Sequence, residues 1–302
     1  MSGVTPPAQH ACARMVWTRR KFARKDQLLR AICLDHLSLS DLTAIELIEV
    51  AARLDCNAVS LFVTPLPIGP YRDLVNDRAA RAEVRTALRD TGIEIGVIEP
   101  FLIGADIDWA MIQAIVELTA ELGGTVSALA LDQDRERLAA SLGRLSELVR
   151  RAGTRMAIEN FTLSAARTPG DALTLANAAG DDVGLTVDVL HIMRAGGNWG
   201  DVAALPADRI FHVQLSDGPR RMPADLMLEA TQRRLPPGEG EFELTRLLPL
   251  LPLTARLAVE APFAAPAGMT PLERGRQIVG ATRTLLARSG ARADADRPMM
   301  KE

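Results

Sequence analysis

Four polar residues at the ends of four successive strand-like segments have the types and the spacing of a metal site. They are Glu159, Asp188, Gln214 and Glu260. Large aliphatic residues flank each of them, and side chains of a strand alternate between its two faces, so the four polar groups point toward one common interior. Three carboxylates that converge in this way repel one another unless they are protonated or neutralised by a cation. A divalent ion is the simplest way to neutralise them.

The ligand atoms of this site would all be oxygens, from three carboxylates and one amide. Such hard ligands favour Mn²⁺ or Mg²⁺, with manganese first, while Co²⁺ or Zn²⁺ stays open because availability also decides occupancy. A divalent ion chelated by the carbonyl and hydroxyl of an α-hydroxy ketone makes the intervening C–H acidic enough for a carboxylate base. Removal of this proton gives an enediolate. If the proton returns to the neighbouring carbon, the substrate is isomerised, and if it returns to the opposite face of the same carbon, the substrate is epimerised. If the enediolate instead expels a β-hydroxyl group, the substrate is dehydrated. The residues therefore leave three reaction classes open.

Eight short β-rich runs alternate with helical patterns, which is typical of parallel β/α units. The runs are 28–35, 57–63, 93–100, 125–131, 155–161, 183–191, 209–217 and 256–262. Eight units without a linker favour a single closed (β/α)₈ TIM barrel over an open doubly wound sheet. No GxGxxG turn follows the first run, which argues against a dinucleotide-binding fold. Barrel enzymes place function at the carboxyl ends of the strands, where the four polar residues stand.

The segments between the runs contain recognisable helix signals. The pattern at 40–54 predicts a helix capped by Ser40 or Asp41, and the pattern at 108–124 predicts a helix that ends on glycines. One long irregular stretch, 218–240, includes a short helical pattern. A loop of this length at the catalytic face is expected to form a lid or a wall of the site.

The predicted domains are a polar, basic extension at 1–26, the barrel at 27–290 and a polar tail at 291–302. The extension contains TRRKFARK, which resembles a twin-arginine signal, but charged residues follow it instead of an apolar stretch. The net charge of −3 gives no reason to expect nucleic acid or a membrane as partner, and no window is apolar enough to span a bilayer. Three cysteines at irregular spacings fit a reducing compartment, so a cytoplasmic location is expected.

The chain resembles the sugar phosphate isomerase/epimerase family, which has the xylose isomerase-like barrel. The likeness spans about 28–288 and rests on TVDVLHIMRAGG with its DxxH motif, IFHVQLSDGP, PGEGEFEL and AVEAP. It implies one divalent metal held by Glu159, Asp188, Gln214 and Glu260. It also implies that Glu159 and Glu260 are the acid/base pair and that His191 and Arg220 bind substrate oxygens. Many members have histidine in place of Gln214, although the hydroxypyruvate isomerase and inosose dehydratase branches look similar in using glutamine.

Residue counts narrow the range of related activities. A nuclease with three zinc ions needs several histidines at its site. The chain has only four, one of them in the extension, which argues against such a nuclease. A Schiff-base aldolase needs a lysine inside the barrel, whereas the lysines are Lys21, Lys25 and Lys301. His212 lies one pleat below Gln214 and is expected to be an interior or ligand-supporting histidine.

Strand alternation also makes a prediction about Glu99 in the third run. It puts Glu99 in line with Ile95 and Val97, and therefore predicts that its side chain points away from the site.

The leading hypothesis is a metal-dependent isomerase or epimerase of a sugar, ketoinositol or hydroxy-keto acid. A lyase or dehydratase of a related keto-polyol on the same metal is the alternative, and a noncatalytic barrel is the third. No glycine-rich turn follows the last two runs, so nothing supports a phosphorylated substrate. The expected partner is a small molecule, and a homo-oligomer stays open.

Overall fold

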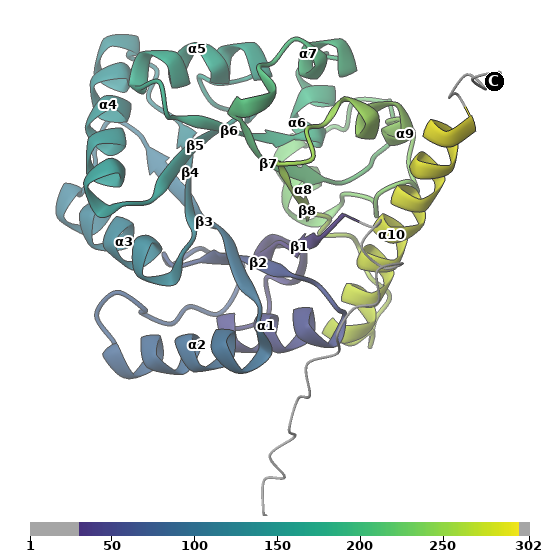
Figure 1. Cartoon of the computed structure of the whole chain (residues 1–302), viewed down its shortest axis with the longest axis horizontal. Helices are drawn as coiled ribbons and strands as arrows, with labels where there is room; N and C mark the ends of the chain where they lie inside the picture. The colour runs from purple at the N-terminus through teal and green to yellow at the C-terminus, as the bar shows by residue number, and fades with distance from the viewer. Residues whose placement is uncertain (1–29, 296–302) are drawn as a thin grey trace, which may run out of the picture.

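The computed structural model describes residues 30–295, and they form a closed barrel of eight parallel strands (Figure 1). The strands are β1 (Ile32–Leu34), β2 (Ala58–Phe62), β3 (Glu94–Ile103), β4 (Thr125–Ala130), β5 (Arg155–Glu159), β6 (Gly184–Asp188), β7 (Ile210–Leu215) and β8 (Arg256–Val259). β8 pairs with β1 and closes the sheet. The prediction of a single (β/α)₈ barrel is confirmed. The predicted extension at 1–26 lies outside the described residues.

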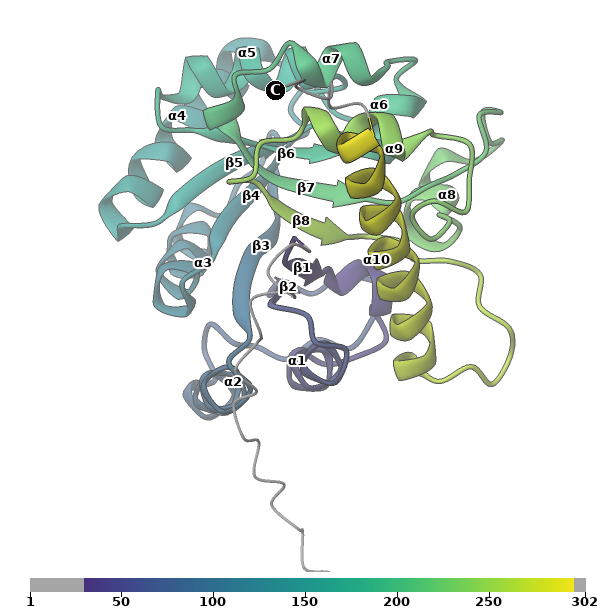
Figure 2. The same ribbon diagram turned by 45° about the vertical axis from the view of Figure 1, so that its right-hand side comes forward.

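Ten α-helices are described, and they surround the barrel (Figures 1 and 2). They are α1 (Ala44–Arg53), α2 (Arg78–Thr91), α3 (Trp109–Leu122), α4 (Arg135–Ala152), α5 (Pro169–Ala179), α6 (Val189–Arg194), α7 (Trp199–Ala203), α8 (Leu226–Gln232), α9 (Leu244–Leu247) and α10 (Pro271–Ala295). α10 contacts both α1 and α9 and continues past residue 290, where the barrel was predicted to end. In residues 30–295 no helix is both long and apolar enough to cross a membrane.

Local signals explain where several helices begin and end. Asp108 caps the start of α3, where its carboxylate accepts hydrogen bonds from two backbone N–H groups, and Gly123 caps its end. The φ of Gly123 is +77°, a left-handed conformation that glycine adopts without steric cost. The prediction that this helix ends on glycines is confirmed.

The start of α1 differs from the prediction. The capping residue is Thr43, not Ser40 or Asp41: its hydroxyl accepts from the backbone N–H of Glu46, and the Glu46 carboxylate accepts from the N–H of Thr43. This reciprocal pair satisfies two N–H groups that a helix start leaves free. Residues Ser40 and Asp41 belong instead to the turn that follows a short 3₁₀ helix, His36–Leu39.

This cap leads to a stability prediction. Thr43→Ala is expected to lower the free energy of unfolding by about 1 kcal/mol, because it removes the reciprocal hydrogen bonds. Ser40→Ala is the matched control and should change it by less than about 0.5 kcal/mol. Urea unfolding at neutral pH measures both, and equal losses in the two variants would contradict the assignment.

The apolar core lies between the strands and the helices, while the barrel interior is largely polar. Leu185 and Val187 of β6 belong to the outer core, and Thr186 between them faces inward, where its hydroxyl lies 2.9 Å from that of Ser127. Small side chains from β1, β2 and β8 form a separate interior cluster. Polar side chains near the strand ends therefore project into an interior that already contains hydrogen-bonding groups.

Candidate active site

The four residues predicted to form a metal site meet at the carboxyl ends of β5 to β8. All four are buried. In the sheet register Asp188 pairs with Gln214, and the side-chain nitrogen of Gln214 donates to Glu260 Oε1 at 3.1 Å. Glu159 belongs to a group with Asp188 and His191 whose ligand atoms all lie within 4.8 Å of one another. The structure therefore brings the four side chains into one connected cluster.

Neighbouring side chains hold the backbone beside this cluster. The Asn160 side chain accepts from the N–H of Asp188 at 3.0 Å and donates to the carbonyl of Asp188 at 2.9 Å. Ser38 donates to the carbonyl of Val259 at 3.0 Å and accepts from the N–H of Ala261 at 2.8 Å. These bonds fix the chain at Asp188 and on both sides of Glu260.

Arg234 is a central residue of this cluster that the sequence reasoning missed. Its guanidinium lies 2.8 Å from Asp188 Oδ2 and 2.9 Å from Glu260 Oε2, and its side chain is 2% exposed. Its Nε donates to the carbonyl of Ala230 at 2.8 Å. The sequence QRR does not show which of its two arginines is buried, and the neighbouring Arg233 is exposed. Backbone pairing in the loop, between Asp217 and Leu235, and from Arg234 N–H to the Pro262 carbonyl, turns Arg234 inward.

The loop that carries Arg234 is fixed to the barrel by a buried ion pair. Arg194 at the end of α6 contacts both carboxylate oxygens of Glu229 in α8, each at 2.6 Å. The Asp217 carboxylate accepts from the backbone N–H groups of Gly218, Gly238 and Phe242. The stretch 218–240 therefore forms a fixed wall of the site in this structure.

Glu99 lies inside the barrel, so the prediction that it points outward is wrong. It is buried, and its Oε2 accepts from the Gln214 side chain at 3.2 Å. The reason is a β-bulge: Val59 and Leu61 of β2 pair with Ile95 and Ile98 of β3, which inserts one extra residue into β3. The alternation shifts by one position there, and Glu99 turns toward the interior.

The two predicted substrate-binding residues occupy different places. His191 lies in α6, buried, with Nε2 3.8 Å from Asp188 Oδ2 and Nδ1 3.1 Å from the Thr162 hydroxyl. Arg220 contacts Glu243 at 2.5 Å with a side chain that is 61% exposed, and it lines a separate cavity of about 300 Å³. His191 therefore lies in the cluster of predicted ligands, whereas Arg220 lies outside it.

A family model described as a xylose isomerase-like TIM barrel matches residues 48–255. The chain belongs to this family. A curated 3-dehydroshikimate dehydratase of Pseudomonas aeruginosa is 27% identical over 196 residues, which cover 58% of this chain and 30% of that protein. The chain thus spans less than a third of the length of that relative.

Solved structures of low sequence identity share the fold. A xylose isomerase-like TIM barrel/4-hydroxyphenylpyruvate dioxygenase fusion protein is 20% identical, with a TM-score of 0.74 over 90% of this chain and 46% of that one. The IOLI protein with a bound zinc atom is 17% identical, with a TM-score of 0.69 over 86% and 99%. An L-ribulose 3-epimerase is 15% identical, with a TM-score of 0.67 over 91% and 100%. These likenesses concern the barrel as a whole.

The charges inside this xylose isomerase-like barrel are unbalanced. Five carboxyl groups are buried there: Asp35, Glu99, Glu159, Asp188 and Glu260. Among the described residues, Arg234 is the guanidinium that ion-pairs with them. An excess of buried negative charge is very costly unless protons or further cations compensate it.

Protons compensate part of this charge when no cation is bound. Burial raises the pKa of Glu159 well above its ordinary range, and the charge of Asp188 adds to the effect. Burial also raises the pKa of Glu260 well above its range, although Arg234 opposes it. Burial acts to raise the pKa of Asp188 too, but Arg234 and His191 outweigh it and the pKa is lowered. Burial lowers the pKa of His191 to about 4, so its imidazole is neutral at ordinary pH.

The oxygen atoms of the four predicted ligands fit a divalent cation. Gln214 Oε1 is buried without a hydrogen-bond partner. The Glu159 carboxylate makes no hydrogen bond or ion pair with the described residues, although it lies beside Asp188. An amide oxygen and carboxylates are the ligands that Mn²⁺ and Mg²⁺ prefer. Glu159 and Gln214 thus have donor atoms for a metal, while Asp188 and Glu260 would share their carboxylates between the metal and Arg234.

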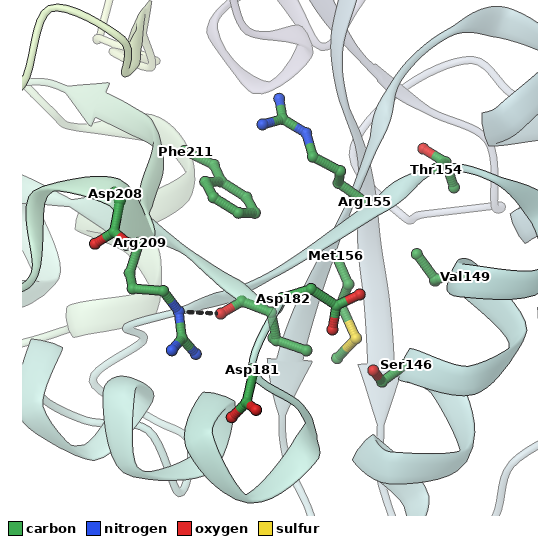
Figure 3. Close-up of a pocket in the computed structure, with 11 residues that line it drawn as sticks. Ser146, Val149, Thr154, Arg155, Met156, Asp181, Asp182, Asp208, Arg209 and Phe211 are labelled. Atoms are coloured by element: carbon green, nitrogen blue, oxygen red, sulfur yellow. Dashed lines mark hydrogen bonds between the residues drawn. The ribbon is translucent and has the colours of Figure 1, made fainter.

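A cavity of about 270 Å³ lies at the amino end of the barrel, opposite the four predicted metal ligands (Figure 3). Residues that precede or begin β5, β6 and β7 line it, among them Arg155, Asp182 and Arg209. It contains none of the predicted site residues.

Proposed function

We propose that the protein is a divalent-metal-dependent isomerase or epimerase of a small α-hydroxy carbonyl compound. The observation that carries the proposal is the meeting of Glu159, Asp188, Gln214 and Glu260 at the carboxyl end of the barrel, where Gln214 Oε1 is buried without a hydrogen-bond partner among residues 30–295. Mn²⁺ or Mg²⁺ is the favoured ion, and Zn²⁺ is a further choice because the similar IOLI protein binds it. The fold it shares with an L-ribulose 3-epimerase supports the reaction class.

The metal, when bound, would polarise the carbonyl and hydroxyl of the substrate and so make the C–H between them acidic. Glu159 and Glu260 are the proton carriers of this proposal, and burial raises the pKa of both carboxyl groups in the metal-free protein, which favours their protonated form. Gln214 holds the Glu260 carboxylate through its amide N–H. His191 is neutral and contacts the Thr162 hydroxyl through Nδ1; in the tautomer that carries its proton on Nε2, it can donate a hydrogen bond to a substrate oxygen.

A dehydratase of a keto acid is the second candidate, and Arg234 favours it. A buried guanidinium is the group that best recognises a carboxylate. Two of the five N–H donors of Arg234 face Asp188 and Glu260, its Nε–H faces Ala230, and a second N–H of Nη1 faces the Ser216 hydroxyl at 3.5 Å. One N–H, on Nη2, is left for a substrate. The similar 3-dehydroshikimate dehydratase is named for a substrate that is a carboxylate, which supports the same candidate.

One experiment separates these reactions. The protein is stripped with a chelator, reloaded with Mn²⁺ and incubated in D₂O with ketoses, ketoinositols and 3-dehydroshikimate. Isomerase or epimerase activity is expected to place deuterium on the carbon next to the carbonyl without loss of water, and dehydratase activity to release water. Mass spectrometry and proton NMR of the products measure both. A protein that binds no stoichiometric metal and exchanges no substrate proton would be a noncatalytic barrel.

A further inference from the structure

A second group of potential metal ligands lies deeper in the barrel, next to the four residues at its rim. It consists of Cys33 in β1, Asp35 just after β1 and His212 in β7, all buried. Cys33 Sγ and His212 Nε2 each lie 3.7 Å from Asp35 Oδ1. One ligand atom from each of the three residues falls within 4.8 Å of the other two.

These separations are close to those of a tetrahedral zinc site. Bonds of about 2.3 Å to sulfur and about 2.0–2.2 Å to nitrogen or oxygen place tetrahedral ligand atoms about 3.4–3.6 Å apart. A thiolate, an imidazole and a carboxylate together form a softer donor set than the oxygen ligands at the rim. The two groups would therefore select different ions.

Hydrogen bonding leaves this group incomplete. Asp35 Oδ2 and His212 Nε2 are buried and have no hydrogen-bond partner. Asp35 Oδ1 accepts from the Ser60 hydroxyl and from the Cys33 thiol, whereas Asp35 Oδ2 has no partner among the described residues. A buried unpartnered carboxylate oxygen and an unpartnered imidazole nitrogen cost free energy, and a cation would satisfy both.

The backbone leaves room beside these ligands. A Cβ atom at Gly96 would come within 2.9 Å of Cys33 Sγ and 3.5 Å of His212 Cε1, so the absence of a side chain at Gly96 makes space next to the two ligands. A cavity of about 110 Å³ at the amino end of the barrel is lined by Gly96, His212 and Arg256. It shares Arg155 and Phe211 with the larger cavity of Figure 3. His212 thus borders a cavity at the end of the barrel opposite the rim site, which Arg155 and Arg256 also line.

The negative charge around Asp35 also favours a cation at this place. Asp35 also belongs to a group with Glu99 and Glu260 whose ligand atoms lie within 4.8 Å. Asp35 therefore stands between the deep ligands and the rim site, and one ion at the rim leaves several interior carboxyl groups without a cation. A second ion would compensate this remaining charge.

We propose that Cys33, Asp35 and His212 bind a second divalent ion of the borderline-soft class, such as Zn²⁺ or Co²⁺, inside the barrel. The ion takes the Cys33 thiolate, so one proton leaves the thiol when the ion binds. This site does not depend on the proposed reaction at the rim.

Cobalt binding tests the proposal. Metal-stripped protein is titrated with Co²⁺, the bound metal is counted by elemental analysis after gel filtration, and thiolate-to-cobalt absorption is recorded in the near ultraviolet. Wild-type protein is expected to bind two equivalents, one of them with the thiolate band. Cys33→Ser should lose the band and one equivalent.

The other two cysteines provide matched controls. Cys56→Ser, which changes another buried thiol, and Cys12→Ser, outside residues 30–295, should both keep the band. Glu159→Gln should lose the rim equivalent and keep the band, so failure of the rim site and failure of the deep site give different results. If Cys33→Ser does not fold by circular dichroism, His212→Asn must lose the band instead. A wild-type protein without a thiolate band, or a band that survives in both Cys33→Ser and His212→Asn, overturns the proposal.

Discussion

Arg234→Met is expected to lower the free energy of unfolding of the metal-stripped protein by about 3–5 kcal/mol at neutral pH. The guanidinium contacts Asp188 and Glu260 at 2.8 and 2.9 Å in a site closed to water, so its removal leaves two buried carboxyl groups without their cation. Urea unfolding in the presence of a chelator measures the loss.

The pH dependence of this loss follows from the same contacts. Arg234 lowers the pKa of Asp188 and opposes the rise in the pKa of Glu260, so both values rise in the variant. A group whose pKa is raised by folding contributes stability at low pH that is lost as the pH rises through its folded pKa. The variant should therefore be closer to wild type in mild acid than at neutral pH.

Arg220→Met is the matched control for this variant. Arg220 pairs with Glu243 at an exposed position, and its replacement should change stability by less than about 1 kcal/mol. Equal losses in the two variants, or a loss at Arg234 that grows in acid, would contradict the central role of Arg234.

Glu159→Gln and Glu260→Gln are each expected to reduce kcat by about 10²–10⁴-fold, because an amide cannot carry the proton that the reaction moves and binds the ion less tightly than a carboxylate. The measurement uses the substrate identified by deuterium exchange, with Mn²⁺ at saturation and bound metal counted in each variant. A variant that keeps its metal but loses turnover has lost proton transfer, whereas one that loses both has lost a ligand.

The control for these two variants is Glu239→Gln, in the same wall of the site but exposed to solvent. It should turn over at the wild-type rate. Retention of wild-type kcat in Glu159→Gln or Glu260→Gln would remove that residue from the proton-carrying role.

The sequence predicted the barrel and the rim ligands because both depend on short-range regularities. Alternation within β5 to β8 sends Glu159, Asp188, Gln214 and Glu260 to the same face, and a closed parallel sheet brings these strand ends together. Their roles as ligands and proton carriers stay predictions.

Residues whose positions depend on irregular backbone or on distant contacts were not predictable in this way. Glu99 turns inward because of one extra residue in β3, and a bulge has no clear signal in the run IEIGVIEP. Arg234 is turned inward by pairing of its loop with Asp217 and Pro262, which are distant in sequence. The cap of α1 was misassigned because Ser40, Asp41 and Thr43 all have suitable side chains, and the 3₁₀ helix before them decides which one starts the helix.

The hydrogen bonds of Gln214 have a consequence for how the rim site binds its ion. The amide nitrogen donates to Glu99 and to Glu260, which fixes the rotamer and turns the oxygen away from both carboxyl groups. The rotamer entropy of a glutamine, up to about 2 kcal/mol, is therefore lost during folding and not during ion binding. The fixed rotamer presents the amide nitrogen, and not the oxygen, to Glu260, so an ion shared by Gln214 Oε1 and Glu260 requires a half-turn of the amide that breaks both hydrogen bonds.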